Sequence, residues 1–185
     1  MKENSPHTGI TLLELMVVIA IIGIMTSIAV GGLNSMVPKM RLNSAVRDLI
    51  SNMQKARLEA VKRNTGCRVV FDTNNSRYAI SIGSGADDTW STIGDNSNLT
   101  IVDLSDYGSG VGYGSGDAEF DATEDEDPIT GDFVSYNADV ATYNSRGTSS
   151  AGYVYLSNQS NDTYAVGTQS TGILINKKWS GNSWE

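Results

Sequence analysis

The sequence predicts an α+β protein in which one long amino-terminal helix packs on an antiparallel sheet. Two observations predict the helix over residues 10 to 63: an uncharged apolar run, followed by apolar residues spaced three and four apart. A third predicts the sheet, because short runs of alternating β-forming residues fill much of the chain after Cys67. The 185 residues allow one modest domain beside the helix.

Charge is unevenly divided along the chain, whose formal net charge is -8. Up to Gly66 there are eight Lys or Arg and four Asp or Glu, a balance of +4, whereas the remainder has five and seventeen, a balance of -12. An acidic second part repels nucleic acid and lipid phosphate unless a local basic patch is present. We therefore expect DNA not to be a partner.

Histidine and cysteine each occur once, at His7 and Cys67. A lone cysteine cannot form an internal disulfide, and we expect Cys67 to be a small buried apolar side chain. A Ser-His-Asp or Cys-His site would need His7, which precedes the apolar run. The sequence therefore predicts neither an enzyme nor a bound cofactor.

The apolar run from Leu15 to Leu33 has about 19 residues without a charge, enough to cross a bilayer core as a helix. A buried core helix would show a polar stripe, which this run lacks. The alternative is a secretory signal before an unrelated secreted enzyme, because Ser27 and Ala29 have the spacing that a signal peptidase reads. The run is longer than a usual signal core and begins beside Glu14, so a membrane helix is favoured.

Residues 8 to 24, TGITLLELMVVIAIIGI, resemble the prepilin signal of type IV pilins and type II secretion pseudopilins. In that family a short hydrophilic leader ends in Gly, a prepilin peptidase cuts after it, the new amino terminus is methylated, and a glutamate occupies the fifth mature position. The resemblance implies a leader of residues 1–9, cleavage between Gly9 and Ile10, methylation of Ile10 and an assembly role for Glu14. Ile10 replaces the commoner Phe.

A physical argument supports the role of Glu14. A lone carboxylate in the membrane costs roughly 2 to 4 kcal/mol near mid-bilayer. In a stack of subunits the amino terminus of a neighbouring Ile10 can form a charge-assisted contact with Glu14, which would set the axial register. The alternative is a carboxylate that reaches the lipid headgroups.

The resemblance also implies one span of the bacterial inner membrane, with the globular domain in the periplasm. Lys39, Arg41 and Arg47 after the apolar run outweigh Lys2 before it, so the positive-inside rule alone predicts the opposite orientation. The orientation therefore rests on the resemblance, which requires cytoplasmic processing.

Beyond the glycine pair at 31 and 32, an amphipathic half of the same helix is predicted to residue 63, with Gly66 as a left-handed cap. The glycine pair and Pro38 predict a bend or a melted stretch between the two halves. The expected buried stripe consists of Leu42, Ala45, Val46, Leu49, Met53, Ala56, Ala60 and Val61.

The remainder is predicted to form one antiparallel sheet that covers this stripe. Its first two strands read as a hairpin around residues 74–76, with Val69, Phe71, Tyr78, Ile80 and Ile82 as core candidates. The expected strands are 67–73, 77–83, 99–104, 133–137, 141–145, 153–158, 163–168 and 172–179.

The order of one amino-terminal helix followed by antiparallel strands resembles that of the minor pseudopilin H group of type II secretion and of the related FimT- and FimU-like minor pilins. These are called the GspH/FimT/FimU-like group below. Residues 54–64 (QKARLEAVKRN), 144–147 (NSRG) and 170–175 (STGILI) carry this narrower resemblance. It implies a minor pseudopilin, a structural subunit of the type II secretion pseudopilus, with a prepilin peptidase, other pseudopilins or pilins and inner-membrane lipid as partners. The alternative is a minor type IV pilin for pilus priming or DNA uptake.

The implied organisation is a leader at 1–9, a transmembrane and assembly helix at 10–37, its amphipathic half at 38–66 and a β-rich periplasmic domain at 67–185. Two further segments are candidates for ligand binding, one for a metal ion and one for DNA. The acidic loop 117–132 lacks the glycine and terminal glutamate of an EF-hand, so we expect a solvated loop and no metal. Lys177, Lys178 and Trp179 could contact DNA, but they read better as a strand end with a capping tryptophan.

Overall fold

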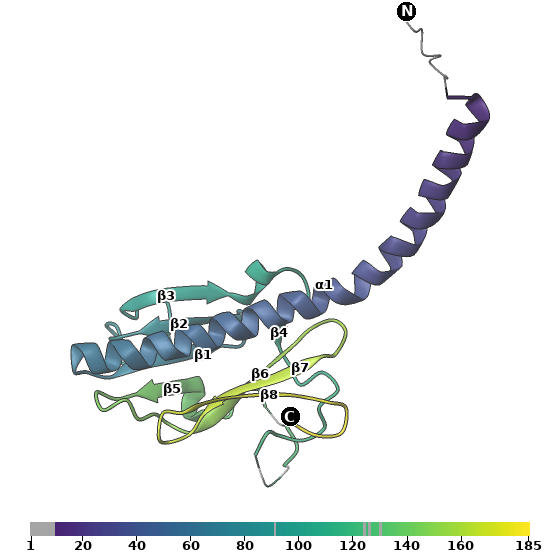
Figure 1. Ribbon diagram of the computed structural model, residues 1–185. Helices are drawn as coiled ribbons and strands as arrows, with labels where there is room; N and C mark the ends of the chain where they lie inside the picture. Colours follow the sequence, from purple (N-terminus) through teal and green to yellow (C-terminus); the bar gives the residue numbers. More distant parts are fainter. Residues whose placement is uncertain (1–9, 91, 124, 126, 130) are drawn as a thin grey trace, which may run out of the picture. The chain divides into compact units, whose positions relative to one another are not determined.

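The computed structural model describes residues 10–90, 92–123, 125, 127–129 and 131–185, without the side chains of residues 28–35. The chain divides into two compact units, Met1–Val37 and Pro38–Glu185, which are described separately below. The predicted α+β class is confirmed, since one helix is followed by antiparallel strands (Figure 1).

Helix α1 spans Leu12–Arg63 and includes Pro38. The expected melted stretch is absent from the backbone that the structure describes, because the helix continues through both glycines and the proline. Such residues weaken a helix without ending it when the flanking turns keep their own hydrogen bonds. Within the described residues, no helix is both long and apolar enough to cross a membrane. The expected membrane segment, 15–33, extends into the residues whose side chains are not described.

The carboxyl end of α1 is capped by Asn64, and the prediction of Gly66 was wrong. Asn64 has a φ of 51°, and its backbone N–H donates to Val61 while that of Thr65 donates to Ala60. This pair of bonds is the Schellman pattern, in which the left-handed residue directly follows the helix. Asparagine tolerates the left-handed conformation better than most residues, so glycine is not required here.

Two four-stranded antiparallel sheets follow, where the sequence predicted one. The first has the order β3-β2-β1-β5 and the second β4-β6-β7-β8. The predicted hairpin forms, and Phe71 lies opposite Tyr78 in its register. The strands are β1 Cys67–Asp72, β2 Arg77–Ser81, β3 Asn98–Asp103, β4 Gly112–Tyr113, β5 Val140–Tyr143, β6 Gly152–Ser157, β7 Thr163–Thr168 and β8 Leu174–Lys178.

The expected strand at 133–137 does not form. Phe133 has a φ of 69°, which interrupts extended backbone, and only an isolated bridge joins Val134 to Val154. The short strand β4 was missed because two residues give no periodic signal. Short 3-10 helices form at Leu104–Tyr107 and Asn137–Asp139.

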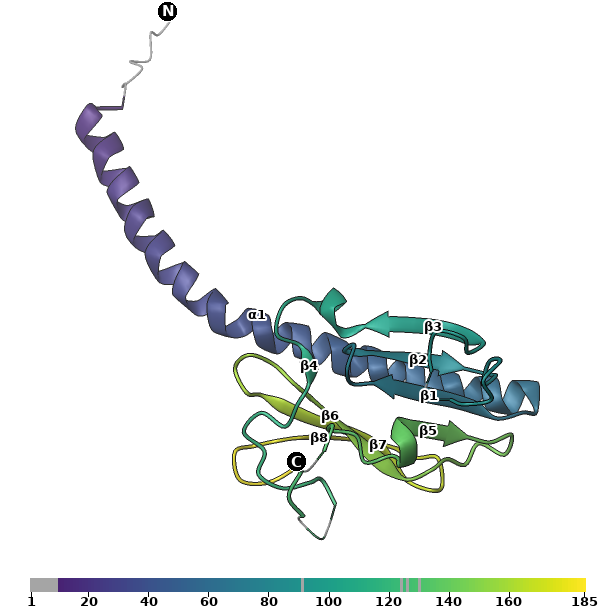
Figure 2. The same ribbon diagram turned by 180° about the vertical axis from the view of Figure 1, so that it is seen from behind.

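The core of the second unit lies between α1 and both sheets, which Figures 1 and 2 show from opposite sides. The predicted stripe is buried except for Val61, which is 48% exposed, and Ile82 is half-buried. The helix therefore presents the narrow apolar face that the spacing predicts, with one residue at its margin. Buried stripe residues are Leu42, Ala45, Val46, Leu49, Met53, Ala56 and Ala60.

Candidate functional site

The first candidate site is the amino terminus of α1, where Thr11 and Glu14 form a capping box. Glu14 Oε2 accepts hydrogen bonds from the backbone N–H of Thr11 at 3.0 Å and from its hydroxyl at 3.2 Å. The backbone N–H of Glu14 donates in return to Thr11 Oγ1 at 3.2 Å. Thr-x-x-Glu before an apolar run signals this motif, so sequence reasoning could have identified Thr11.

The capping box places the carboxylate of Glu14 one turn from Ile10, at the positive end of the helix dipole. Gly9 lies outside the described residues. Ile10 is 80% exposed. The large apolar side chains that follow it, from Leu12 to Met25, are between 49% and 76% exposed. Among the side chains described between Ile10 and Ser27, Glu14 is the one charged group. This end of the helix therefore combines a solvent-exposed apolar surface with a single carboxylate.

The second candidate site is a junction in the second unit, where the three segments of the narrower resemblance meet. Arg57 of α1 donates from Nε to the carbonyl of Gly147 at 2.8 Å. Gly172 lies against the same carbonyl, because a Cβ built on Gly172 would stand 2.1 Å from it. Gly172 also has a φ of 82°, which favours glycine. The two turns thus cross under α1 at a distance that only glycine permits.

An apolar groove of about 600 Å³ opens at this junction. Leu58, Val61 and Ile173 are 68%, 48% and 55% exposed, and both charged residues along the groove are arginines, Arg57 and Arg146. The sequence alone gave no signal for this groove, because its walls come from segments about 90 residues apart.

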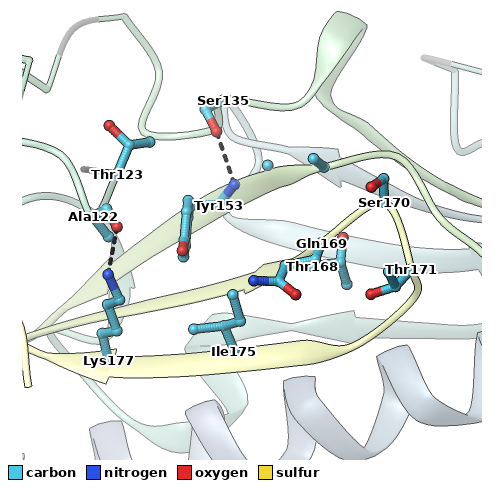
Figure 3. Close-up of a pocket in the computed structure, with 12 residues that line it drawn as sticks. Ala122, Thr123, Ser135, Tyr153, Thr168, Gln169, Ser170, Thr171, Ile175 and Lys177 are labelled. Carbon is cyan, nitrogen blue, oxygen red and sulfur yellow. Dashed lines mark hydrogen bonds between the residues drawn. The ribbon is translucent and has the colours of Figure 1, made fainter. Parts of the chain in front are cut away.

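A second groove, of about 660 Å³, lies on the outer face of the sheet β4-β6-β7-β8 (Figure 3). Tyr153 of β6 and Ile175 and Lys177 of β8 line it together with hydroxyl and amide side chains. Lys177 Nζ donates to the carbonyl of Ala122 at 2.7 Å, and the backbone N–H of Tyr153 donates to Ser135 Oγ at 2.8 Å. The groove therefore has a mixed lining of polar and apolar side chains, with one aromatic residue.

The carboxyl-terminal segment holds the acidic loop against this sheet. Trp184 Nε1 donates to the carbonyl of Phe120 at 2.9 Å, and the rings of Trp179 and Phe120 lie 4.9 Å apart. Trp179 is 7% exposed, so it cannot stack on a nucleic-acid base, and the reading as a capping tryptophan fits. Among the described residues, no group of three or more acidic, His or Cys side chains could hold a metal.

Several ionisable groups of the second unit have shifted pKa values, among them Cys67 and Asp139. Burial raises the pKa of the Cys67 thiol to about 11, as expected for a cysteine that packs as an apolar residue. Burial, together with the neighbouring Asp132 carboxyl, raises the pKa of Asp139 to about 6.

An exposed apolar helix end that continues into an amphipathic half under antiparallel sheets defines a pilin-like subunit. Residues 4–30 match the prokaryotic N-terminal methylation motif. Residues 45–172, more than two thirds of the chain, match the family of the type II transport protein GspH. The chain therefore belongs to the GspH family and is a pseudopilin of type II transport, which confirms the resemblance found in the sequence.

The structure is also similar to that of the minor pseudopilin EpsH from the type 2 secretion system of Vibrio cholerae. The TM-score is 0.48 at 14% sequence identity, and the match covers 74% of this chain and 95% of that chain. No curated protein matches the sequence.

Proposed function

We propose that this chain is a minor, structural subunit of a periplasmic type II secretion pseudopilus, anchored in the inner membrane before assembly. The exposed apolar surface from Ile10 to Met25 carries this proposal, since a helix with such a surface requires either lipid or neighbouring subunits to cover it. The N-terminal methylation motif at residues 4–30 also supports membrane insertion followed by assembly into a filament.

Maturation would proceed by cleavage between Gly9 and Ile10 and methylation of the new amino group. Cleavage leaves Ile10 directly before the capping residue Thr11, so the new terminus lies next to the first turn of α1. Ile10, on the carboxyl side of the proposed cleavage site, precedes Leu12, where α1 begins.

In the filament, Glu14 would accept the amino group of Ile10 from a neighbouring subunit. Glu14 already accepts hydrogen bonds from Thr11 within its own chain, so a free subunit keeps the carboxylate partly satisfied. A carboxylate can accept about four hydrogen bonds, and the neighbour's amine could therefore be added without loss of the cap. The contact would fix the axial position of one subunit on the next.

Mass spectrometry of the membrane-extracted protein tests this maturation. We expect a chain that begins at Ile10 with a methylated amine, and Gly9→Val should block processing because a branched side chain replaces hydrogen at the peptidase site. A terminus at Met1 or near Val30 would refute the proposal. The functional test is a deletion strain, in which the wild-type gene should restore type II secretion and the Gly9→Val variant should not.

A further inference from the structure

The outer edge of β8 carries backbone groups that have no partner among the described residues. Lys178 exchanges backbone hydrogen bonds with Glu185 on the side away from β7, at 2.7 and 2.9 Å. Alternate residues of a strand direct their backbone groups to the same edge, so those of Asn176 and Leu174 point the same way. The structure gives them no hydrogen bond on that side. Two residues, each with an N–H and a C=O, are therefore free to pair with another strand.

Residues 183–185 already begin such a strand. Trp184 bridges Trp179, and the pairing with β8 stops at Lys178 and Glu185. A further extended segment placed in line with residues 183–185 would meet Asn176 and then Leu174 in the same register. Asn176 is exposed and Leu174 half-buried, so this edge is accessible.

The two grooves lie on opposite faces of this same edge. Leu174 lines the apolar groove beside α1, whereas Ile175 and Lys177 line the groove on the outer face (Figure 3). Because side chains of an added strand alternate between the faces of the sheet, one set would enter each groove. Main-chain pairing with pockets for alternate side chains is the arrangement of peptide recognition by strand addition.

The charges along the edge specify the chemistry of the added strand. Arg57 and Arg146 line the groove on the α1 side and Lys177 lines the outer one. Lys178 lies at the end of the free edge, where its backbone pairs with that of Glu185. Among the residues that the structure describes, none that lines either groove is acidic. Exposed Leu58, Val61 and Ile173 add an apolar surface. A matching segment is therefore extended and carries both apolar and acidic side chains.

We propose that the free edge of β8 binds an extended acidic segment of a neighbouring pseudopilin by strand addition. This inference rests on the proposed function, since it takes the partner from the same filament. This contact is separate from the one at Glu14. Residues of the second unit would then determine which neighbouring subunit binds.

Hydrogen exchange on the full-length protein in detergent tests the proposal, alone and in complex with the other pseudopilins of its own secretion system. We expect the amides of Leu174 and Asn176 to exchange quickly in the free protein and at least about tenfold more slowly in the complex. A complex that forms with both amides unchanged would overturn strand addition while leaving the proposed function intact. Failure of wild-type protein to join any complex would instead refute the proposed function.

A proline substitution supplies a matched pair of variants. The N–H of Asn176 points away from β7, so Asn176→Pro should remove a donor from the free edge without breaking the existing ladder. We expect about tenfold weaker binding to the purified pseudopilin complex, because one hydrogen bond is lost and the ring obstructs the edge. Ile101→Pro is the control, since Ile101 is 48% exposed on the edge strand β3 of the other sheet and should bind normally.

Charge reversal completes the test. The exposed side chain of Arg146 lines the groove, and Arg146→Glu should weaken binding to the same complex because the positive charge that an acidic segment would meet becomes negative. Equal binding of wild type, Asn176→Pro and Arg146→Glu would overturn the proposal. Concentration-dependent protection of Asn176 without any partner would also overturn it, because the occupant would then be a second copy of this chain.

Discussion

Replacing Glu14 by Gln separates its two roles at the amino terminus of α1. Glutamine keeps an oxygen that can accept the hydrogen bonds from Thr11, so the capping box should survive in large part. The charge, however, is removed, and the amine of a neighbouring Ile10 would lie unpaired in apolar surroundings. We expect processing to continue and assembly to fail.

The magnitude follows from the surroundings of the contact. An uncompensated buried charge costs roughly 3 to 5 kcal/mol, which corresponds to a loss of about two to four orders of magnitude in the equilibrium for incorporation. Loss of a helix cap costs only about 1 kcal/mol, or somewhat less than tenfold. The two explanations therefore differ by more than tenfold in their expected effect.

The assay measures the fraction of mature subunits, those that begin at Ile10, recovered in the purified pseudopilin complex. Thr11→Ala is the control, because it removes the capping hydroxyl but keeps the carboxylate. Glu14→Ala should insert and mature normally and fail in assembly as Glu14→Gln does. If Glu14→Gln assembles like wild type, or if Thr11→Ala is equally impaired, the register role of Glu14 is wrong.

Three further predictions concern the second unit. A fragment of residues 38–185 should be a water-soluble monomer in analytical ultracentrifugation, because it keeps the buried stripe and loses the exposed apolar helix; aggregation of the folded fragment would count against this. Gly172→Ala should lower the free energy of unfolding by about 2 kcal/mol or more in urea denaturation. The new Cβ would clash with the carbonyl of Gly147, and the positive φ of residue 172 disfavours alanine. An unchanged denaturation midpoint would contradict the close crossing of the two turns. Asp139→Asn should stabilise the protein by about 1 kcal/mol at pH 7.5 and hardly at all at pH 4. The figure for pH 7.5 is smaller than the full pKa shift would give, because Asp139 is partly exposed and solvent screens its charge.

The sign of the last effect follows from the raised pKa of Asp139. A carboxyl whose pKa rises from 3.8 to about 6 on folding favours the folded state below pH 3.8, and this contribution is lost as the pH rises through 6. Asparagine imitates the protonated form at every pH, so its advantage should grow as the pH rises from 3.8 to about 6 and be complete above that. Equal effects at both pH values would show that folding does not raise the pKa of Asp139.

Local pattern was enough to predict the elements whose signals lie within a few turns or one hairpin. The spacing of apolar residues after Pro38 located the buried face of α1, and alternation around residues 74–76 located β1 and β2 with their core side chains. The leader motif and Glu14 are also local, as is the Thr11 to Glu14 capping box that the Thr-x-x-Glu spacing would have revealed. Such features depend on neighbours in sequence, which the sequence itself supplies.

The sequence by itself thus determined the long helix, most of the strands and the family, whereas the tertiary structure decided how the strands divide into two sheets and which surfaces they leave open. Pairing of β5 with β1, and not with β6, depends on contacts between distant residues. The crossing of Gly147 and Gly172 and the free edge of β8 likewise exist only once segments far apart in the chain have met. Period and propensity describe one segment at a time, so the partner of a strand edge cannot be read from either.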